Sequence, residues 1–163
     1  MHKWKRDSFC TLIAVSMCLG CGSRRNAAGE AEGNDGKPKV VVITRQSAFK
    51  DTLVARLSDD YGTRTHLTVM DISTLNDIDE DDFDAIVVMG ARMGFLLFSA
   101  KERRFLRKLD HPDKLVLLMT CAIPDWKWDR EDIDVISGAS SAENLDPFYK
   151  EIHLRLDTIL SRQ

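Results

Sequence analysis

The stretch VVVITRQSAFKD, residues 40–51, joins a β-branched apolar run to a segment with the residue spacing of a helix. Its turn contains the hydroxyls of Thr44 and Ser47 and the cations Arg45 and Lys50, but no glycine. Hydroxyls, backbone N–H groups at a helix start and nearby cations can together bind an anion. In the alternative interpretation, Thr44 and Ser47 merely cap the helix while Arg45 and Lys50 are solvated.

Two other segments that could bind a ligand also follow apolar runs. The sequence GARMG, residues 90–94, has two glycines that allow a tight turn near a ligand, or that serve the turn alone. After the run KLVLLMTCA, Trp126 and Trp128 could stack on a flat aromatic ligand. They could equally form a hydrophobic lid or an exposed patch for a partner.

Other kinds of site are disfavoured by spacing. The three domain histidines are scattered, so the sequence predicts no metal site. The acidic run STLNDIDEDDFD lacks the central glycine and closing glutamate of a calcium loop, which favours a solvated face. The segment SGASS, residues 137–141, lacks the spacing of a hydrolase nucleophile. Cys121 is predicted to be a buried core cysteine rather than a redox thiol.

The N-terminus has the layout of a secretory signal. Lys3, Lys5 and Arg6 precede an apolar run of about a dozen residues, which is too short for a membrane span of roughly 20. The sequence CLGC, residues 18–21, resembles the bacterial lipobox, which implies lipidation of Cys21. We therefore expect a lipoprotein signal peptide at residues 1–20; an ordinary cleaved signal or a short uncleaved anchor is the alternative.

Residues 21–38 are predicted to be the acylated cysteine followed by a flexible tether. The segment GSRRNAAGEAEGNDGKP contains no large apolar side chain, so it cannot offset the entropy of ordering. We expect the lipid on Cys21 to anchor the protein to a membrane of the cell envelope. The domain would then lie in the periplasm or elsewhere outside the cytoplasm.

Residues 39–163 are long enough for one domain. Removal of residues 1–20 leaves 20 basic and 25 acidic residues, a net charge of −5, which argues against nucleic acid as a partner. With Cys21 lipidated, Cys121 has no disulfide partner, so the domain depends on its hydrophobic core.

The periodicity within the domain alternates between buried strands and amphipathic helices. Apolar runs predict buried strands at residues 39–44, 84–90 and 114–122. Residues 65–72 are also predicted to be a strand, and residues 134–140 a shorter one. Helix signals lie between them: an N-cap at Ser47 with Gly62 after the end, a capping box from Ser99 to Glu102, and an N-cap at Asp146 before Pro147. Residues 73–84 are expected to be mostly irregular, with one turn. The pattern indicates an α/β three-layer sandwich with a parallel sheet.

Four segments carry a resemblance to a known family: VVVITRQSAFKDTLVARL, DFDAIVVMGARMGFLLFSAKERRFLRKL, KLVLLMTCAIP and DIDVISGASSAENLDPFYKEI. With them, residues 39–160 resemble flavodoxins and the protoporphyrinogen-oxidase-type relatives of flavodoxin. The resemblance implies a five-stranded parallel sheet of order 2-1-3-4-5, with FMN at the switch point between the first and third strands.

The resemblance also implies a set of cofactor-binding residues in the loops after the first, third and fourth strands. Two positions depart from the family pattern, because Ala48 stands where flavodoxins place glycine and Lys50 where they place threonine. The implied FMN-binding residues are Thr44, Arg45, Gln46, Ser47, Ala48, Lys50, Gly90, Ala91, Arg92, Met93, Gly94, Thr120 and Trp126.

Two functions of different classes follow. The first is a lipid-anchored FMN domain that transfers electrons to a redox partner or reduces a quinone-like or porphyrin-like compound. If the protein is an enzyme, it would be an FMN-dependent oxidoreductase. The alternative is a cofactor-free binding or assembly module that uses the loop of Trp126 and Trp128 to hold a protein partner.

Overall fold

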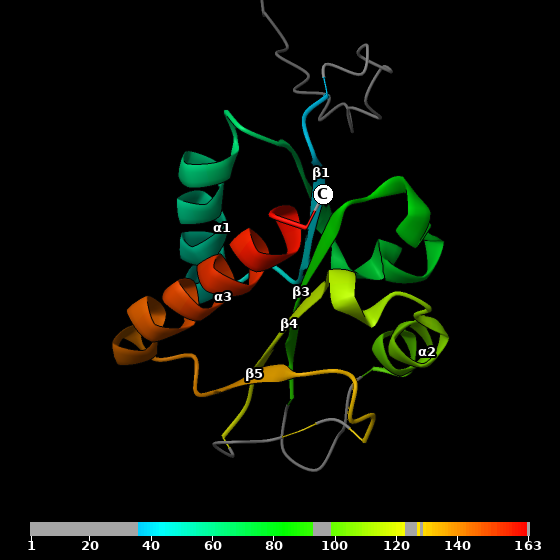
Figure 1. The fold of residues 1–163 in the computed structure, drawn as a ribbon. Helices are drawn as coiled ribbons and strands as arrows, with labels where there is room; N and C mark the ends of the chain where they lie inside the picture. Colours follow the sequence, from blue (N-terminus) through cyan, green and yellow to red (C-terminus); the bar gives the residue numbers. More distant parts are fainter. Residues whose placement is uncertain (1–35, 93–98, 123–126, 128, 163) are drawn as a thin grey trace, which may run out of the picture. The chain divides into compact units, whose positions relative to one another are not determined.

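Five short strands rich in Val, Ile, Leu and Met form the centre of the computed structural model (Figure 1). The structure describes residues 36–92, 99–122, 127 and 129–162, which belong to the unit Asn34–Gln163. The predicted signal peptide, Cys21 and the tether up to residue 35 lie outside the described residues. The strands are β1 (Lys39–Thr44), β2 (His66–Asp71), β3 (Ala85–Ala91), β4 (Leu115–Thr120) and β5 (Val135–Gly138).

All neighbouring strands pair in parallel, in the order β2-β1-β3-β4-β5. Parallel strands need crossovers that cover the faces of the sheet, which explains why the inner strands β1, β3 and β4 are buried on both sides. The predicted fold class and strand order are confirmed: the chain has a flavodoxin-like fold. The carboxyl ends of the strands therefore meet along one edge.

Helices α1 (Ala48–Tyr61) and α3 (Leu145–Leu160) cover one face of the sheet (Figure 1). Alternate strand residues pack against their apolar stripes, in keeping with the two-residue period of a strand. This core comprises Val40, Val42, Ala85, Val87, Met89, Val116, Leu118 and Ile136 from the sheet, and Leu53, Leu57, Tyr61, Phe148, Ile152, Leu156 and Ile159 from the helices.

Helix α2 (Ala100–Lys108) and the crossover after β2 cover the opposite face. The crossover forms two 3₁₀ helices, η1 (Ile72–Asp77) and η2 (Glu80–Asp82), where the sequence predicted a single turn. Asp71 and Asp79 start these helices, because their side chains accept backbone N–H bonds two residues ahead. Two further 3₁₀ helices, η3 (Pro112–Lys114) and η4 (Ala142–Asn144), precede β4 and α3.

The helix starts agree with the predicted caps in two of three cases. The Ser47 hydroxyl accepts the Lys50 N–H at the start of α1, and Ser99 with Glu102 forms the capping box of α2. Helix α3 instead begins at Leu145, so the predicted N-cap at Asp146 is wrong. The carboxylate of Asp146 instead forms an ion pair with Arg56 of α1 at 2.5 Å. The two residues are far apart in the sequence, so a local pattern could not predict this pair.

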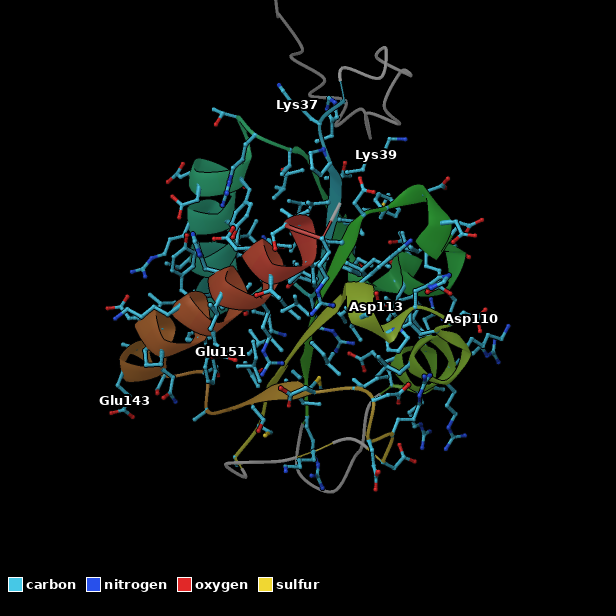
Figure 2. All side chains as sticks on the ribbon, in the orientation of Figure 1. Lys37, Lys39, Asp110, Asp113, Glu143 and Glu151 are labelled. Carbon is cyan, nitrogen blue, oxygen red and sulfur yellow. The ribbon has the colours of Figure 1, made fainter. Side chains whose placement is uncertain are left out.

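Charged side chains project from the outside of the domain, among them Asp110, Glu143 and Glu151 (Figure 2). Among the described residues, none of the helices is both long and apolar enough to cross a bilayer.

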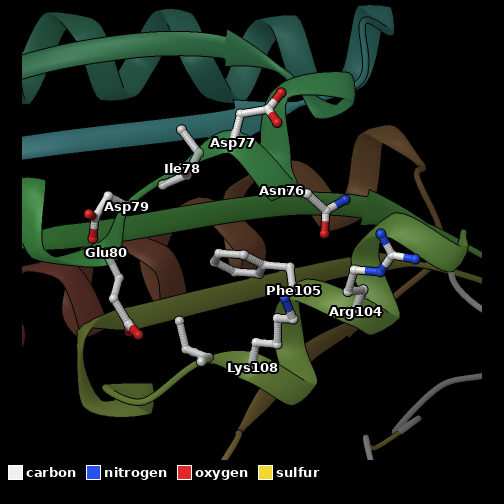
Figure 3. Close-up of a pocket in the computed structure, with 9 residues that line it drawn as sticks. Asn76, Asp77, Ile78, Asp79, Glu80, Arg104, Phe105 and Lys108 are labelled. Carbon is white, nitrogen blue, oxygen red and sulfur yellow. The ribbon is translucent and has the colours of Figure 1, made fainter.

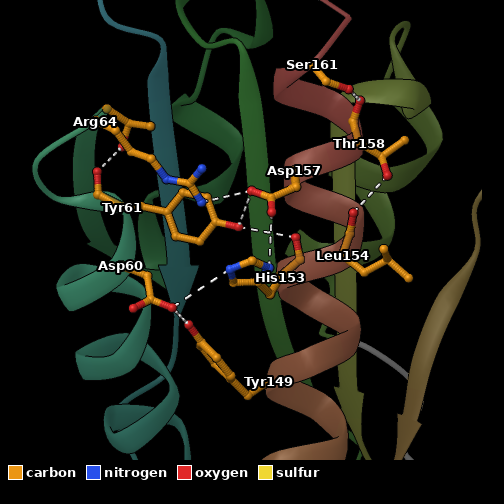
Figure 4. Close-up of polar contacts among 10 residues, drawn as sticks. Asp60, Tyr61, Arg64, Tyr149, His153, Leu154, Asp157, Thr158 and Ser161 are labelled. Atoms are coloured by element: carbon orange, nitrogen blue, oxygen red, sulfur yellow. Dashed lines mark hydrogen bonds and ion pairs between the residues drawn. The ribbon is translucent and has the colours of Figure 1, made fainter.

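A polar network joins the end of α1 to α3 (Figure 4). The Tyr61 ring is fully buried, and its hydroxyl donates to the Asp157 carboxylate at 2.9 Å. Arg64 donates to the same carboxylate at 2.8 Å, and its guanidinium lies 4.1 Å from the centre of the Tyr61 ring. His153 Nδ1 is 3.2 Å from the second oxygen of Asp157. Burial raises the pKa of Asp157, but the bonds from Tyr61 and Arg64 and the nearby His153 outweigh it and hold that pKa below its ordinary value.

Replacing Tyr61 by Phe is expected to destabilise the protein at pH 7 by about 1 kcal/mol, because the part-exposed Asp157 carboxylate loses a donor. A carboxyl whose pKa is lowered by folding stabilises above its unfolded pKa, and this contribution is lost as pH falls through the folded pKa. The difference between Tyr61→Phe and wild type should therefore shrink towards pH 3. Urea unfolding at both pH values measures it, and equal differences would contradict the assignment. Tyr149→Phe, which removes a hydroxyl bonded to Asp60 at the exposed edge, is the matched control.

Candidate functional site

The candidate site lies at the carboxyl edge of the sheet, between β1 and β3. After β1 the chain turns to α1 on one face, whereas after β3 it continues towards α2 on the other. This divergence of neighbouring connections is the topological switch point at which α/β sheets bind ligands. Thr44 lies beside Met89 and Ala91 beside Thr120, so three predicted site segments meet at this edge.

The loop from β1 to α1 is open to solvent. Arg45, Gln46, Ser47 and Ala48 are exposed, while Thr44 is buried and donates to the Arg45 carbonyl at 3.3 Å. The Ser47 hydroxyl caps α1, which confirms the capping role that the sequence left open. The Ser47 hydroxyl already accepts the Lys50 N–H. The N–H groups of Ala48 and Phe49, in the first turn of α1, have no carbonyl partner within the helix and can face an anion.

Lys50 differs from its loop neighbours because only 3% of it is exposed. Its position on α1 explains the burial: Lys50, Leu53 and Leu57 form one helical stripe against the sheet. Among the described residues, its ammonium forms no hydrogen bond or ion pair. The interpretation of Lys50 as a solvated cation is therefore wrong.

Two charged groups act on the Lys50 ammonium. Burial lowers the pKa of Lys50 most strongly, Arg45 lowers it further, and Glu102 of α2 opposes both. Glu102 is itself only 3% exposed, and its carboxylate accepts the Ser99 N–H at 2.7 Å. The side chains of Lys50 and Glu102 are thus both largely buried, one on each face of the sheet, and Glu102 lies close to Gly90 of β3.

Gly90 lies within β3 rather than in a turn, and close packing is the reason for glycine there. A Cβ at this position would lie 2.5 Å from Met119 Sδ and 2.9 Å from Glu102 Oε1. The role of Gly90 as a turn residue, expected from the sequence, is thereby corrected. The bare backbone of β3 is what lets the Glu102 carboxylate approach the edge of the sheet.

The remaining predicted residues at this edge extend the pairing of β3 with β4. Arg92 N–H donates to the Thr120 carbonyl at 2.8 Å, and the Thr120 hydroxyl donates to the Gly90 carbonyl at 3.3 Å. Ala91 is exposed at the end of β3, and Arg92 is half-buried. Met93, Gly94, Trp126 and Trp128 lie outside the described residues.

Cys121 lies directly after β4, with 6% of the residue exposed, so its predicted burial is confirmed. Its N–H donates to the Gly138 carbonyl at 2.7 Å. Among the described residues, no group of three or more His, Cys, Asp or Glu side chains is placed to hold a metal ion.

Sequence reasoning missed Glu102 as a site residue and missed the burial of Lys50. The signal was present in both cases. Lys50 lies three residues before Leu53, and Glu102 three before Phe105, so each charge falls on an apolar stripe. A charge on a stripe that faces the core is a stronger sign of a site than the same charge in a loop, because charged side chains are seldom fully buried.

The described part of the site is suited to an anion. The N-terminus of α1 contributes N–H donors and a partial positive charge, and Lys50 and Arg45 contribute full charges. These groups fit the phosphate of FMN, with a buried ammonium in place of part of a backbone cradle.

No protein-family model and no curated protein matches the sequence. Solved structures of similar fold include a flavodoxin from the domain Archaea, with 9% identity and a TM-score of 0.47, over 74% of this chain and 98% of that one. They also include the lysine decarboxylase LdcF of Francisella novicida, with 11% identity and a TM-score of 0.44, over 80% of this chain. This chain spans 18% of the decarboxylase. The assignment of the fold rests on the strand order and the parallel pairing described above.

Proposed function

We propose that this chain, which has a flavodoxin-like fold, binds FMN at the switch point between β1 and β3. The largely buried side chain of Lys50 at the start of α1 is the observation that carries this proposal. Bound FMN would supply one- or two-electron redox chemistry. The chain would bind and orient the cofactor, with electron transfer or reduction of a quinone-like or porphyrin-like compound as the activity.

Lys50 supports the proposal because its charge is poorly compensated. A buried ammonium costs free energy unless it is paired, and a phosphate above the α1 N-terminus would supply an anion. Arg45, exposed in the adjacent loop, can add a second cation at the solvent side. The hydroxyl of Ser47 already caps the helix, so it contributes to the phosphate only if it accepts the Lys50 N–H and donates outward.

We further propose that the domain works at the cell envelope, anchored through a lipid on Cys21 and a tether up to residue 38. The lipobox-like sequence CLGC and the tether composition support this proposal. A tethered domain can meet a membrane-bound redox partner at a high effective concentration.

The second candidate, a cofactor-free binding module, is favoured by Glu102. Its buried carboxylate raises the pKa of Lys50 against burial, so the protein compensates part of the ammonium charge internally. If that compensation is sufficient, the site needs no phosphate, and the fold serves to hold a protein partner.

Titration of the purified protein with FMN distinguishes the two candidates. We expect quenching of flavin fluorescence that saturates, and a melting temperature that rises with FMN concentration. Riboflavin, which lacks the phosphate, should bind at least about tenfold more weakly, equivalent to about 1.4 kcal/mol. Absence of saturable binding by both methods would leave the cofactor-free module. Equal affinity for FMN and riboflavin would remove Lys50 and the α1 N-terminus from the cofactor site.

A further inference from the structure

A separate cavity of about 490 Å³ lies between the crossover after β2 and helix α2 (Figure 3). This volume falls in the range of about 300–1,000 Å³ typical of small-molecule sites. Among the described residues, its lining comes from residues 76–80 of the crossover and from Arg104, Phe105, Lys108 and Leu109. None of the described residues assigned to the FMN site lines it, so its role is argued separately from the proposed function.

The floor of the cavity is apolar. Phe105 and Leu109 lie on the buried stripe of α2, with 7% and 4% of each residue exposed, and Ile78 of the crossover is half-buried. The Phe105 ring lies at the centre of the close-up, between the two walls (Figure 3). Such a floor favours a ligand with an apolar or aromatic side chain.

The two walls carry opposite charges. Helix α2 contributes Arg104 and Lys108, which are four residues apart and therefore share a face. The crossover contributes Asp77 and Asp79, and all four residues are exposed. Within the part of the chain that the structure describes, none of the four forms an ion pair.

The third acidic residue of the lining, Glu80, is already engaged. Its carboxylate accepts the N–H groups of Asp110 and His111, at 2.9 and 3.0 Å. It thereby holds the crossover to the segment after α2. Asp79 retains one oxygen after accepting the Asp81 N–H at 3.1 Å, so Asp77 and Asp79 are the carboxylates that a ligand can use.

We propose that this cavity binds a short peptide with free termini and an apolar side chain. The terminal ammonium binds a carboxylate of the crossover, the terminal carboxylate binds the cations of α2, and the side chain packs on Phe105. A simple anion would meet the carboxylates of the crossover, and a simple cation would meet the cations of α2. A zwitterion with an apolar body satisfies both walls and the floor together.

The test is isothermal titration calorimetry of the full-length protein with the dipeptide Leu-Phe, together with nuclear magnetic resonance to follow the chemical shifts of the lining residues. Saturable heat and shifts at Ile78, Phe105 and Leu109 are expected. The same dipeptide with an acetylated N-terminus and an amidated C-terminus should bind at least about tenfold more weakly, since both charges are removed. No saturable binding, or equal affinity for the blocked peptide, would overturn the proposal.

Charge variants of the walls provide the matched comparison. The double variant Arg104→Gln with Lys108→Gln should lose at least about tenfold in affinity, and Asp77→Asn should weaken binding in the same direction. Arg107→Gln removes an equivalent charge from α2 outside the lining, and should bind like wild type. If Arg107→Gln weakens binding as much as the double variant, the dipeptide responds to the overall charge of α2 and the assigned site is wrong. FMN binding should be unchanged in all of these variants.

Discussion

Lys50→Met is expected to unfold at a higher urea concentration than wild type and yet to bind FMN about 10- to 100-fold more weakly. The gain in stability follows from the buried ammonium, whose pKa is lowered chiefly by burial even though Glu102 opposes this effect. Met has a similar length and no charge, so it retains the packing without the cost of desolvation. The expected gain is about 1 kcal/mol. The loss of affinity corresponds to one charge-assisted hydrogen bond of about 1.5–3 kcal/mol.

The pH dependence of Lys50 has a definite sign. For a lysine whose pKa is lowered by folding, the cost of the charge is full below the folded pKa, and stability rises with pH from the folded pKa to the unfolded one near 10.4. In that window wild type should approach Lys50→Met in stability. FMN affinity should fall over the same window, because the phosphate requires the protonated amine.

Lys150→Met is the matched control, because it removes an exposed lysine from α3. We expect its unfolding midpoint and its FMN affinity to match those of wild type. If Lys50→Met binds FMN normally, Lys50 has no part in the cofactor site. If it is also less stable than wild type, Glu102 depends on the ammonium, and the pair is structural.

The parallel sheet could be predicted because several segments of the sequence indicate it independently. The runs VVVIT and AIVVM are apolar on both faces, and their separation by helical stripes permits few other architectures. Caps that depend on two nearby residues, such as Ser99 with Glu102, could be predicted for the same reason. The start of α3 could not, because the chain enters it directly from η4 with Asn144 at the N-cap, which places Asp146 inside the first turn.

The candidate site was predicted in position but not in electrostatic character. Its place follows from strand direction alone, since the ends of β1, β3 and β4 must share an edge. The interaction of Lys50 with Glu102 joins residues 52 positions apart, on opposite faces of the sheet. Only the packing of both helices determines that electrostatic influence, although the charged positions on each apolar stripe mark the two residues.

Gly90→Val is expected to reduce the free energy of unfolding by about 3 kcal/mol, the upper part of the range for overpacking a core. The first added carbon alone would lie 2.5 Å from Met119 Sδ, and Met119 is fully buried. It would lie 2.9 Å from Glu102 Oε1, on a side chain that the Ser99 N–H holds in place. Displacing Glu102 breaks the capping box of α2, so the cost exceeds that of a simple clash. Urea unfolding measures the change.

A double-mutant cycle with Met119, the residue that the added Cβ would meet, provides a stricter test. Met119→Ala should cost about 2–5 kcal/mol alone, because it leaves a cavity in the core. Combined with Gly90→Val it should cost less than the sum of the two, since valine then occupies part of that cavity. Ala91→Val, at the exposed end of the same strand, should leave stability within about 0.5 kcal/mol of wild type. Additive effects in the cycle would show that Met119 does not limit the space at Gly90, and that the close approach of β3, β4 and α2 is not what requires glycine there.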